Sequence, residues 1–288
     1  MKILHVIDSA GLYGAEIMLL NLMDEQRRIN VTPVLLSLGD LDGRKNELVE
    51  EAQKRNITTI QFNMKRGYSL SSAIKLFRLT NEEEISIIHS HGYKGDILLG
   101  SVPGYLRKIP MMRTQHGRTS TKKLSKIWFY EALDAWIIKR MAAVVHVNKL
   151  GASRAQRMDA VDAHIHIIEN GIPELKFEPE SAIHKDPAVR EFCKEGFIIG
   201  TICRLSEEKG LDNLIEALRL LMTHKENYKA VIIGEGPLED ILRKKISTYG
   251  LTERILLAGY RKQAYHYLPL FKMFVLPSLT EGLPITIL

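Results

Sequence analysis

The sequence predicts an α/β protein with two doubly wound parallel sheets, each covered by helices on both faces. Short apolar runs suited to buried strands alternate with segments of helical periodicity over about the first 170 residues. The alternation stops in a stretch rich in Pro, Glu, Lys and Asp and then resumes. A chain of 288 residues also exceeds what one hydrophobic core usually serves. We therefore expect a first domain at 1–172, a connection at 173–195 and a second domain at 196–288.

Each predicted strand is an apolar run, and each predicted helix repeats its apolar residues at helical spacing. The strands of the first domain are expected at 3–7, 31–38, 57–62, 85–89, 110–115, 143–147 and 165–168. Its helices are expected from residue 17 and at 44–55, 70–79, 96–106 and 126–141. The second domain should have strands at 197–203, 229–233, 255–258 and 273–276, and helices at 211–222, 238–249 and 263–271.

Composition sets limits on location and partners. The 40 Lys and Arg residues exceed the 34 Asp and Glu residues, which favours anionic partners such as nucleotides, phospholipid surfaces or nucleic acid without choosing among them. The two cysteines, Cys193 and Cys203, have no metal-binding spacing and fit a reducing cytosol. The apolar stretch before Asp8 is too short for a signal-peptide core, and no run reaches the length of a transmembrane helix. We expect a cytoplasmic protein.

Four successive strand-end loops of the second domain contain residues suited to a nucleotide diphosphate. They carry Arg204 with Lys209, then residues 234–237, then residues 259–261, and finally Ser278 with residues 281–284. Consecutive parallel strands place such loops along one edge of a sheet, where ligands bind. Guanidinium and ammonium groups can neutralise the charge of a leaving diphosphate. No Asp-rich metal motif occurs in these loops, so we expect a metal-independent mechanism.

The first strand runs into a loop with Gly11 and Gly14 and then into a helix. Backbone N–H groups at such a place can bind an anion. The spacing lacks the full dinucleotide pattern, so a tight turn that needs glycine explains it equally well.

An ordered set of motifs resembles the family-four retaining glycosyltransferases of GT-B fold, also called glycosyl transferases group 1. The second half contributes ICRLSEEKGLDNLIEAL, VIIGEGPLEDIL, ILLAGY and VLPSLTEGLPITIL. The first half contributes Gly14-Ala15-Glu16, HSHG at 89–92, TQHG at 114–117 and ENGI at 169–172. The resemblance covers nearly the whole chain and implies two Rossmann-like domains, the first on the acceptor side and the second binding a nucleotide sugar.

The resemblance also implies catalytic roles. Arg204 and Lys209 would bind the donor diphosphate and stabilise the leaving nucleoside diphosphate. Glu281 would be the first carboxylate of the family's paired-glutamate motif and would reach hydroxyls of the transferred sugar. His116, on the other domain, would face the donor sugar; a structural histidine bonded to a loop carbonyl is the alternative.

The remaining donor contacts that the resemblance implies come mostly from loops. Backbone N–H groups of Leu283 and Ile285 would touch sugar or phosphate, and Tyr260 and Arg261 would border the base. The other expected donor-binding residues are Gly14, Gly234, Gly236 and Gly282.

One departure from the family pattern concerns the second glutamate of the paired motif, which grips the nucleotide ribose in the family. Its position falls beyond Leu288. We therefore expect a C-terminally truncated chain with an incomplete second domain.

Two histidine pairs have spacing suited to a metal. His89 and His91 alternate on one strand, as do His164 and His166 on another. No cysteine or carboxylate completes either set, so we expect no metal site and no cofactor besides the sugar nucleotide.

The segment 122–140 is basic and aromatic, with Lys122, Lys123, Lys126 and Trp128 near its start. It fits either a peripheral membrane contact or a core helix with a solvated basic start.

The predicted function is transfer, with retention, of a hexose-type sugar from a UDP- or GDP-sugar to a saccharide or lipid-linked acceptor, in polysaccharide or glycoconjugate biosynthesis. We expect no nucleic-acid partner. Two alternatives stay open: a GT-B sugar-nucleotide epimerase, and a catalytically inactive fragment that binds nucleotide.

Overall fold

The computed structural model describes residues 1–9, 11–40, 46–64, 69–102, 107–116, 133, 136–149, 164–174, 186–224 and 227–288. It divides into two compact units, Met1–Pro173 with Gly282–Ile285, and Glu174–Glu281 with Thr286–Leu288. The predicted α/β class with two parallel sheets is confirmed.

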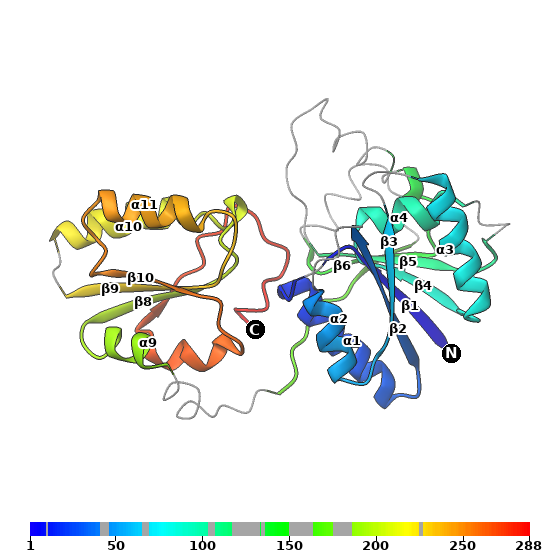
Figure 1. Cartoon of the computed structure of the whole chain (residues 1–288), viewed down its shortest axis with the longest axis horizontal. Helices are drawn as coiled ribbons and strands as arrows, with labels where there is room; N and C mark the ends of the chain where they lie inside the picture. The colour runs from blue at the N-terminus through cyan, green and yellow to red at the C-terminus, as the bar shows by residue number, and fades with distance from the viewer. Residues whose placement is uncertain are drawn as a thin grey trace. The chain divides into compact units, whose positions relative to one another are not determined.

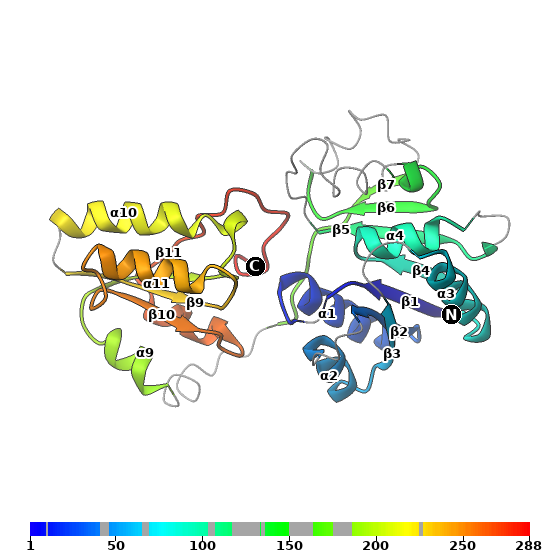
Figure 2. The same cartoon turned by 45° about the horizontal axis from the view of Figure 1, so that its top comes forward.

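The first unit contains a seven-stranded parallel sheet in the order β3-β2-β1-β4-β5-β6-β7 among the described residues (Figures 1 and 2). The strands are β1 (Lys2–Ile7), β2 (Thr32–Asp40), β3 (Thr58–Met64), β4 (Ile87–Ser90), β5 (Met111–Gln115), β6 (Ala143–His146) and β7 (Ile165–Ile167). The helices are α1 (Gly14–Arg28), α2 (Glu47–Lys54), α3 (Leu70–Glu82) and α4 (Tyr93–Gly100).

Alternating side chains of these strands build a core on each face of the sheet. Leu4 and Val6 of β1 pack on the face covered by α3 and α4, where Leu76 and Leu99 are fully buried. Ile7 packs on the opposite face with buried residues of α1 and α2. Figure 1 shows these two helices on that face of the sheet. Because residues on a strand point alternately to the two faces, the buried His5 lies on the α1 side.

The second unit contains a four-stranded parallel sheet in the order β10-β9-β8-β11 (β8 is labelled in Figure 1 and β11 in Figure 2). Its elements are α9 (Pro187–Phe192), β8 (Phe197–Ile202), η2 (Glu207–Lys209), α10 (Leu211–His224), β9 (Tyr228–Ile233), α11 (Glu239–Thr248), β10 (Ile255–Gly259), η3 (Ala264–Leu270) and β11 (Met273–Phe274). Helices α10 and α11 cover one face, while α9 and η3 cover the other (Figure 1).

The expected helix 96–106 is α4, which begins three residues earlier and ends at Gly100. Three further expectations differ from the structure. The expected helix at 263–271 is the 3₁₀ helix η3, which contains Pro269, a residue without the N–H that an α-helix needs. The expected connection 173–195 contains helix α9, whose Val189 is buried in the second core. Asp186 caps this helix and Pro187 opens it, a start signal readable in the sequence. Finally, β11 ends at Phe274, two residues earlier than expected.

The expected helix 126–141 lies mostly outside the described residues; within it, 133 and 136–138 are helical. None of the helices that the structure describes is long and apolar enough to cross a membrane.

Candidate functional site

The site begins with two neighbouring strands of the second unit. Strand β11 pairs with β8 in parallel, with Met273 opposite Ile199. Their following loops, 203–210 and 275–281, therefore leave the same edge of the sheet. The backbone N–H of Leu279 donates to the carbonyl of Glu208 at 2.8 Å, which joins the two loops directly.

Lys209 and Glu281, 72 positions apart in the sequence, meet at this edge. Nζ of Lys209 donates to Oε1 of Glu281 at 2.5 Å, and their side chains are 20% and 23% exposed. The hydroxyl of Ser278 donates to the same carboxylate oxygen at 2.6 Å. The structure thus brings together the expected diphosphate-binding lysine and the expected sugar-binding carboxylate.

Gly210 allows this close approach of the loops. Its backbone is left-handed, with φ of 63°, and a Cβ there would lie 2.2 Å from the carbonyl oxygen of Pro277. A residue with a side chain would have to separate the two loops, because a carbonyl oxygen fixed in the backbone cannot move aside easily. Glycine at this position therefore helps to place Lys209 beside Glu281.

Arg204 lies two residues beyond the end of β8 and is exposed. The positive charges of Arg204 and Lys209 both lower the pKa of Glu208, which lies between them in the sequence. Burial raises the pKa of the Glu208 carboxyl, but a hydrogen bond from Ser206 and the positive charges of Lys209 and Arg204 outweigh this and leave the pKa below its usual range. The ionised Glu208 thus accepts a hydrogen bond from Ser206 within the loop that carries both cations.

The loop after β9 packs against the loop after β8. Gly234 has φ of 142°, and a Cβ there would lie 1.9 Å from the carbonyl oxygen of Cys203. A Cβ on Gly236 would likewise lie too close to the backbone, 2.5 Å from the carbonyl oxygen of Leu205. The N–H of Leu205 donates to the carbonyl of Glu235 at 2.9 Å. Both predicted glycines therefore serve close packing between two strand-end loops.

The third loop contains Tyr260 and Arg261. Tyr260 is 44% exposed. Nε of Arg261 donates to Oδ2 of Asp186 at 2.5 Å, and the hydroxyl of Tyr267 donates to the same oxygen at 3.0 Å. Burial raises the pKa of Asp186, but these hydrogen bonds and that from the Val189 N–H leave it lower than usual. Arg261 thus anchors the start of α9.

In the first unit, His116 directly follows β5. Its Nε2 lies 3.0 Å from Nδ1 of His91. Burial, and secondarily the charge of Arg113, lowers the pKa of His116 to about 4. Its Nε2 therefore faces another imidazole and not the loop carbonyl of the alternative.

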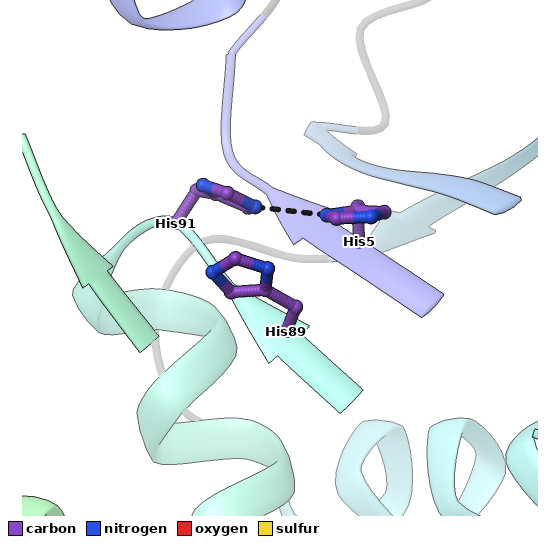
Figure 3. A group of neighbouring side chains, drawn as sticks. All are labelled: His5, His89 and His91. Carbon is purple, nitrogen blue, oxygen red and sulfur yellow. Dashed lines mark hydrogen bonds between the residues drawn. The ribbon is translucent and has the colours of Figure 1, made fainter. Parts of the chain in front are cut away.

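His5, His89 and His91 form a buried cluster beside it (Figure 3). Nδ1 of His5 lies 3.0 Å from Nε2 of His91, and Nε2 of His89 lies 2.8 Å from Oγ1 of Thr114. One nitrogen of each of the three rings lies within 4.8 Å of the others. No cysteine or carboxylate was expected to complete the His89 and His91 pair, and the structure adds a residue that the expectation did not consider, His5, which supplies a third imidazole.

The signal for His5 was a polar residue inside the apolar run of β1. Its register with His89 on the neighbouring strand is known only from the structure. His164 and His166 are exposed and belong to no such cluster among the described residues.

The other predicted donor contacts lie at the first residue of α1 and near the C-terminus. Gly14 is exposed and opens α1. Gly282, Leu283 and Ile285 are half-buried and are grouped with the first unit.

Comparison with known proteins agrees with these two units. Residues 13–174 match the family model described as Glycosyltransferase Family 4, and residues 183–288 match that described as Glycosyl transferases group 1. A relative from Escherichia coli, UDP-Gal:alpha-D-GlcNAc-diphosphoundecaprenol alpha-1,3-galactosyltransferase, is 29% identical over 81% of this chain and 60% of its own length. The putative glycosyltransferase EpsF of Bacillus subtilis is 23% identical over 99% of this chain and 75% of its own length.

Solved structures show the same fold. Anabaena HepE in complex with UDP superposes with a TM-score of 0.75 at 18% identity, covering 96% of this chain and 74% of that one. Staphylococcus aureus TarM, in complex with Fondaparinux, alpha-GlcNAc-glycerol and UDP, gives a TM-score of 0.75 at 12% identity, over 98% and 82% of the two chains. The chain thus spans between 60% and 82% of the length of these four proteins.

The family model that covers residues 13–174 matches more than half of the 288 residues, and the second model accounts for most of the remainder. The chain therefore belongs to the family-four glycosyltransferases, with the GT-B fold.

Proposed function

We propose that this protein transfers a hexose-type sugar from a nucleotide-diphosphate sugar to a hydroxyl of a saccharide or lipid-linked acceptor, with retention and without a metal ion. The juxtaposition of Lys209 with Glu281 supports this most directly, because it puts a cation and a carboxylate at one sheet edge. A diphosphate needs the first and sugar hydroxyls suit the second.

In the proposed reaction, the acceptor oxygen forms a bond to the anomeric carbon while the bond from that carbon to the β-phosphate oxygen breaks. The departing phosphate oxygen takes the acceptor's proton, and attack from the face that the phosphate leaves retains the configuration. Lys209 and the exposed Arg204 stabilise the negative charge that develops on the leaving group.

The remaining donor contacts belong to the same proposal. Glu281, held by Lys209 and Ser278, orients toward hydroxyls of the transferred sugar. The backbone N–H groups of Leu283 and Ile285 contact sugar or phosphate, and Tyr260 borders the base. The relatives' names supply the donor class, since the E. coli relative is a galactosyltransferase named for UDP-Gal and HepE was solved with UDP.

A transfer assay tests the proposal. The protein is incubated with each common UDP- and GDP-sugar, with and without saccharide or lipid-linked acceptors, and products are identified by mass spectrometry. We expect one donor to give an acceptor-dependent product whose anomeric configuration, read by NMR, matches that of the donor. A changed donor sugar formed without acceptor would instead indicate an epimerase, and absence of any product with every pair would count against transferase activity.

Membrane contact through the segment 122–140 is part of the proposal for a lipid-linked acceptor at the cytoplasmic face. Trp136 is 49% exposed, and the guanidinium of Arg140 lies 3.4 Å from the centre of its ring. An exposed aromatic ring beside a cation suits the interface of a membrane. Liposome flotation should fall when Lys122, Lys123 and Lys126 are replaced by Glu; equal flotation would contradict this contact.

A further inference from the structure

A chain of hydrogen bonds runs through the first unit from helix α1 to the end of β5. Oε1 of Gln26 lies 2.8 Å from Nε2 of His5, and Nδ1 of His5 lies 3.0 Å from Nε2 of His91. Nδ1 of His91 then lies 3.0 Å from Nε2 of His116. Figure 3 shows the central link between His5 and His91. Two imidazoles, those of His5 and His91, therefore connect a glutamine on α1 with His116, the histidine that follows β5.

Burial keeps these rings neutral. It lowers the pKa of His5 to about 4 despite the hydrogen bond to Gln26, which raises it. Burial likewise lowers the pKa of His91 well below its usual value, and the neighbouring histidines lower it further. A neutral imidazole carries one N–H donor and one acceptor nitrogen. Each ring in the chain must therefore donate from one nitrogen and accept at the other.

Gln26 decides which nitrogen of each imidazole donates and which accepts along the chain. Its Oε1 can only accept, so Nε2 of His5 carries the proton and Nδ1 of His5 accepts. Nε2 of His91 must then donate to His5, and Nδ1 of His91 must accept from Nε2 of His116. The proton of His116 is thereby assigned to Nε2, and its Nδ1 is left with a lone pair.

Nδ1 of His116 is buried and has no hydrogen-bond partner among the residues that the structure describes. A buried acceptor without a partner is unfavourable unless a ligand or water completes it. We propose that Gln26, His5 and His91 are positioning residues that hold His116 in the tautomer with an unprotonated Nδ1, ready to accept a hydrogen bond from a hydroxyl of the transferred sugar. This inference rests on the proposed function and adds to it the role that the family resemblance implies for His116, contact with the transferred sugar.

A metal ion bound by the same nitrogens would require a different distribution of protons among the imidazoles. In the hydrogen-bonded chain, one proton lies between Nδ1 of His5 and Nε2 of His91, whereas a metal would need lone pairs on both. No carboxylate belongs to the described cluster, so nothing in it would offset the charge of a dication. The electrostatics therefore favour the proton-bearing chain.

Imidazole nitrogen NMR tests the proposal on the protein alone, with EDTA present to remove adventitious metal. The ¹⁵N shifts of histidine rings distinguish protonated from unprotonated nitrogens, and a His116→Gln spectrum assigns the His116 signals. We expect Nδ1 of His116 to be unprotonated and Nε2 protonated at pH 7.5. A protonated Nδ1 on His116 in the unaltered protein would overturn the proposal, as would lone pairs on both His5 Nδ1 and His91 Nε2.

Gln26→Met removes the acceptor with little change in volume and allows the chain to reverse. We expect His116 to become a mixture of the two tautomers. His89 should not change, because it bonds Thr114 rather than the chain, so its signals serve as an internal control. Gln53→Met, which alters an exposed glutamine on α2, is the matched control and should leave every ring unchanged. An unaltered His116 tautomer in Gln26→Met would overturn the proposal.

Transfer kinetics then connect the tautomer with the reaction. The kcat of Gln26→Met should fall by the fraction of molecules that lose the unprotonated Nδ1, so that a half-and-half mixture gives about a twofold loss. If the unaltered protein transfers no sugar, the proposed function fails while the NMR result still decides the tautomer. If Gln26→Met shows the mixed tautomer at full kcat, the positioning role fails while the transferase activity stands.

Discussion

Substitutions of Lys209 and of Glu281 should have opposite effects on nucleotide binding, although the two residues form one ion pair. Lys209→Met removes the cation that the diphosphate needs and leaves Glu281 unneutralised at the same edge. A hydrogen bond to a charged group contributes about 1.5–3 kcal/mol, so the Kd for UDP should rise by a factor of about 10 to 100. Glu281→Gln frees Lys209 and removes a negative charge near the phosphates.

The gain from Glu281→Gln follows from Coulomb's law. Two unit charges about 4 Å apart interact by about 1 kcal/mol in water and by more when partly buried. Both side chains are mostly buried, with 20% and 23% exposed. Loss of the repulsion and of the competition for Lys209 should therefore tighten UDP binding about fivefold, even though sugar transfer falls.

Isothermal titration calorimetry with UDP measures both effects. Lys245→Met is the matched control, because Nζ of Lys245 makes similar ion pairs with Asp212 at 2.5 Å and Glu216 at 2.8 Å, on helices of the same unit. Its Kd for UDP should stay within about twofold of the unaltered value. The reasoning is refuted if Lys209→Met binds UDP as the unaltered protein does, or if Glu281→Gln weakens binding.

Three further predictions concern stability, measured by urea unfolding. Asp96 and Arg113 form a buried ion pair, with 3.0 Å between Oδ2 and Nη1 and side chains at most 7% exposed. Asp96→Asn breaks this pair and should lower the free energy of unfolding by about 3–5 kcal/mol; a loss below about 1 kcal/mol would contradict this. Gly210→Ala should cost about 2 kcal/mol more than Gly250→Ala, since both glycines have positive φ but only the first has no room for a Cβ; equal losses would count against the packing argument. His5 has a folded pKa of about 4, below its unfolded value of 6.5, so its contribution is full above pH 6.5 and is lost as the pH falls toward 4, by on the order of 3 kcal/mol. Stability that stays level over this range would contradict a neutral, buried His5.

Most of the alternating strands and helices could be predicted from the sequence, because each depends on the pattern of apolar residues within a short segment. The apolar run 3–7 became β1 (Lys2–Ile7), and the periodicity of 211–222 became α10 (Leu211–His224). One exception is residues 263–271, which have the periodicity of a helix but form the 3₁₀ helix η3, because Pro269 lacks the N–H that an α-helix needs.

Pairings between distant residues could not be predicted in the same way. The motifs indicated Lys209 and Glu281 one by one, yet their direct contact depends on β11 lying beside β8. Arg261 was expected at the base, and the structure adds its bond to Asp186, 75 positions earlier, which no motif indicated. Such contacts follow from strand order, and strand order is not written in the spacing of the residues.

The histidine chain shows the same limit. His91 and His116 were visible as parts of motifs, but His5 was hidden in an apolar strand and Gln26 in a helix without any motif. The register of β1 with β4, which places His5 opposite His89, brings these residues together.

The central claim is that the loops after β8 and β11 recognise a diphosphate. Calorimetry that compares UDP, UMP and uridine on the unaltered protein tests it most directly, because only the first carries the group that Arg204 and Lys209 are proposed to bind. We expect UDP to bind at least about tenfold more tightly than UMP, and uridine to bind more weakly still. Equal affinities for UDP and UMP would contradict the account.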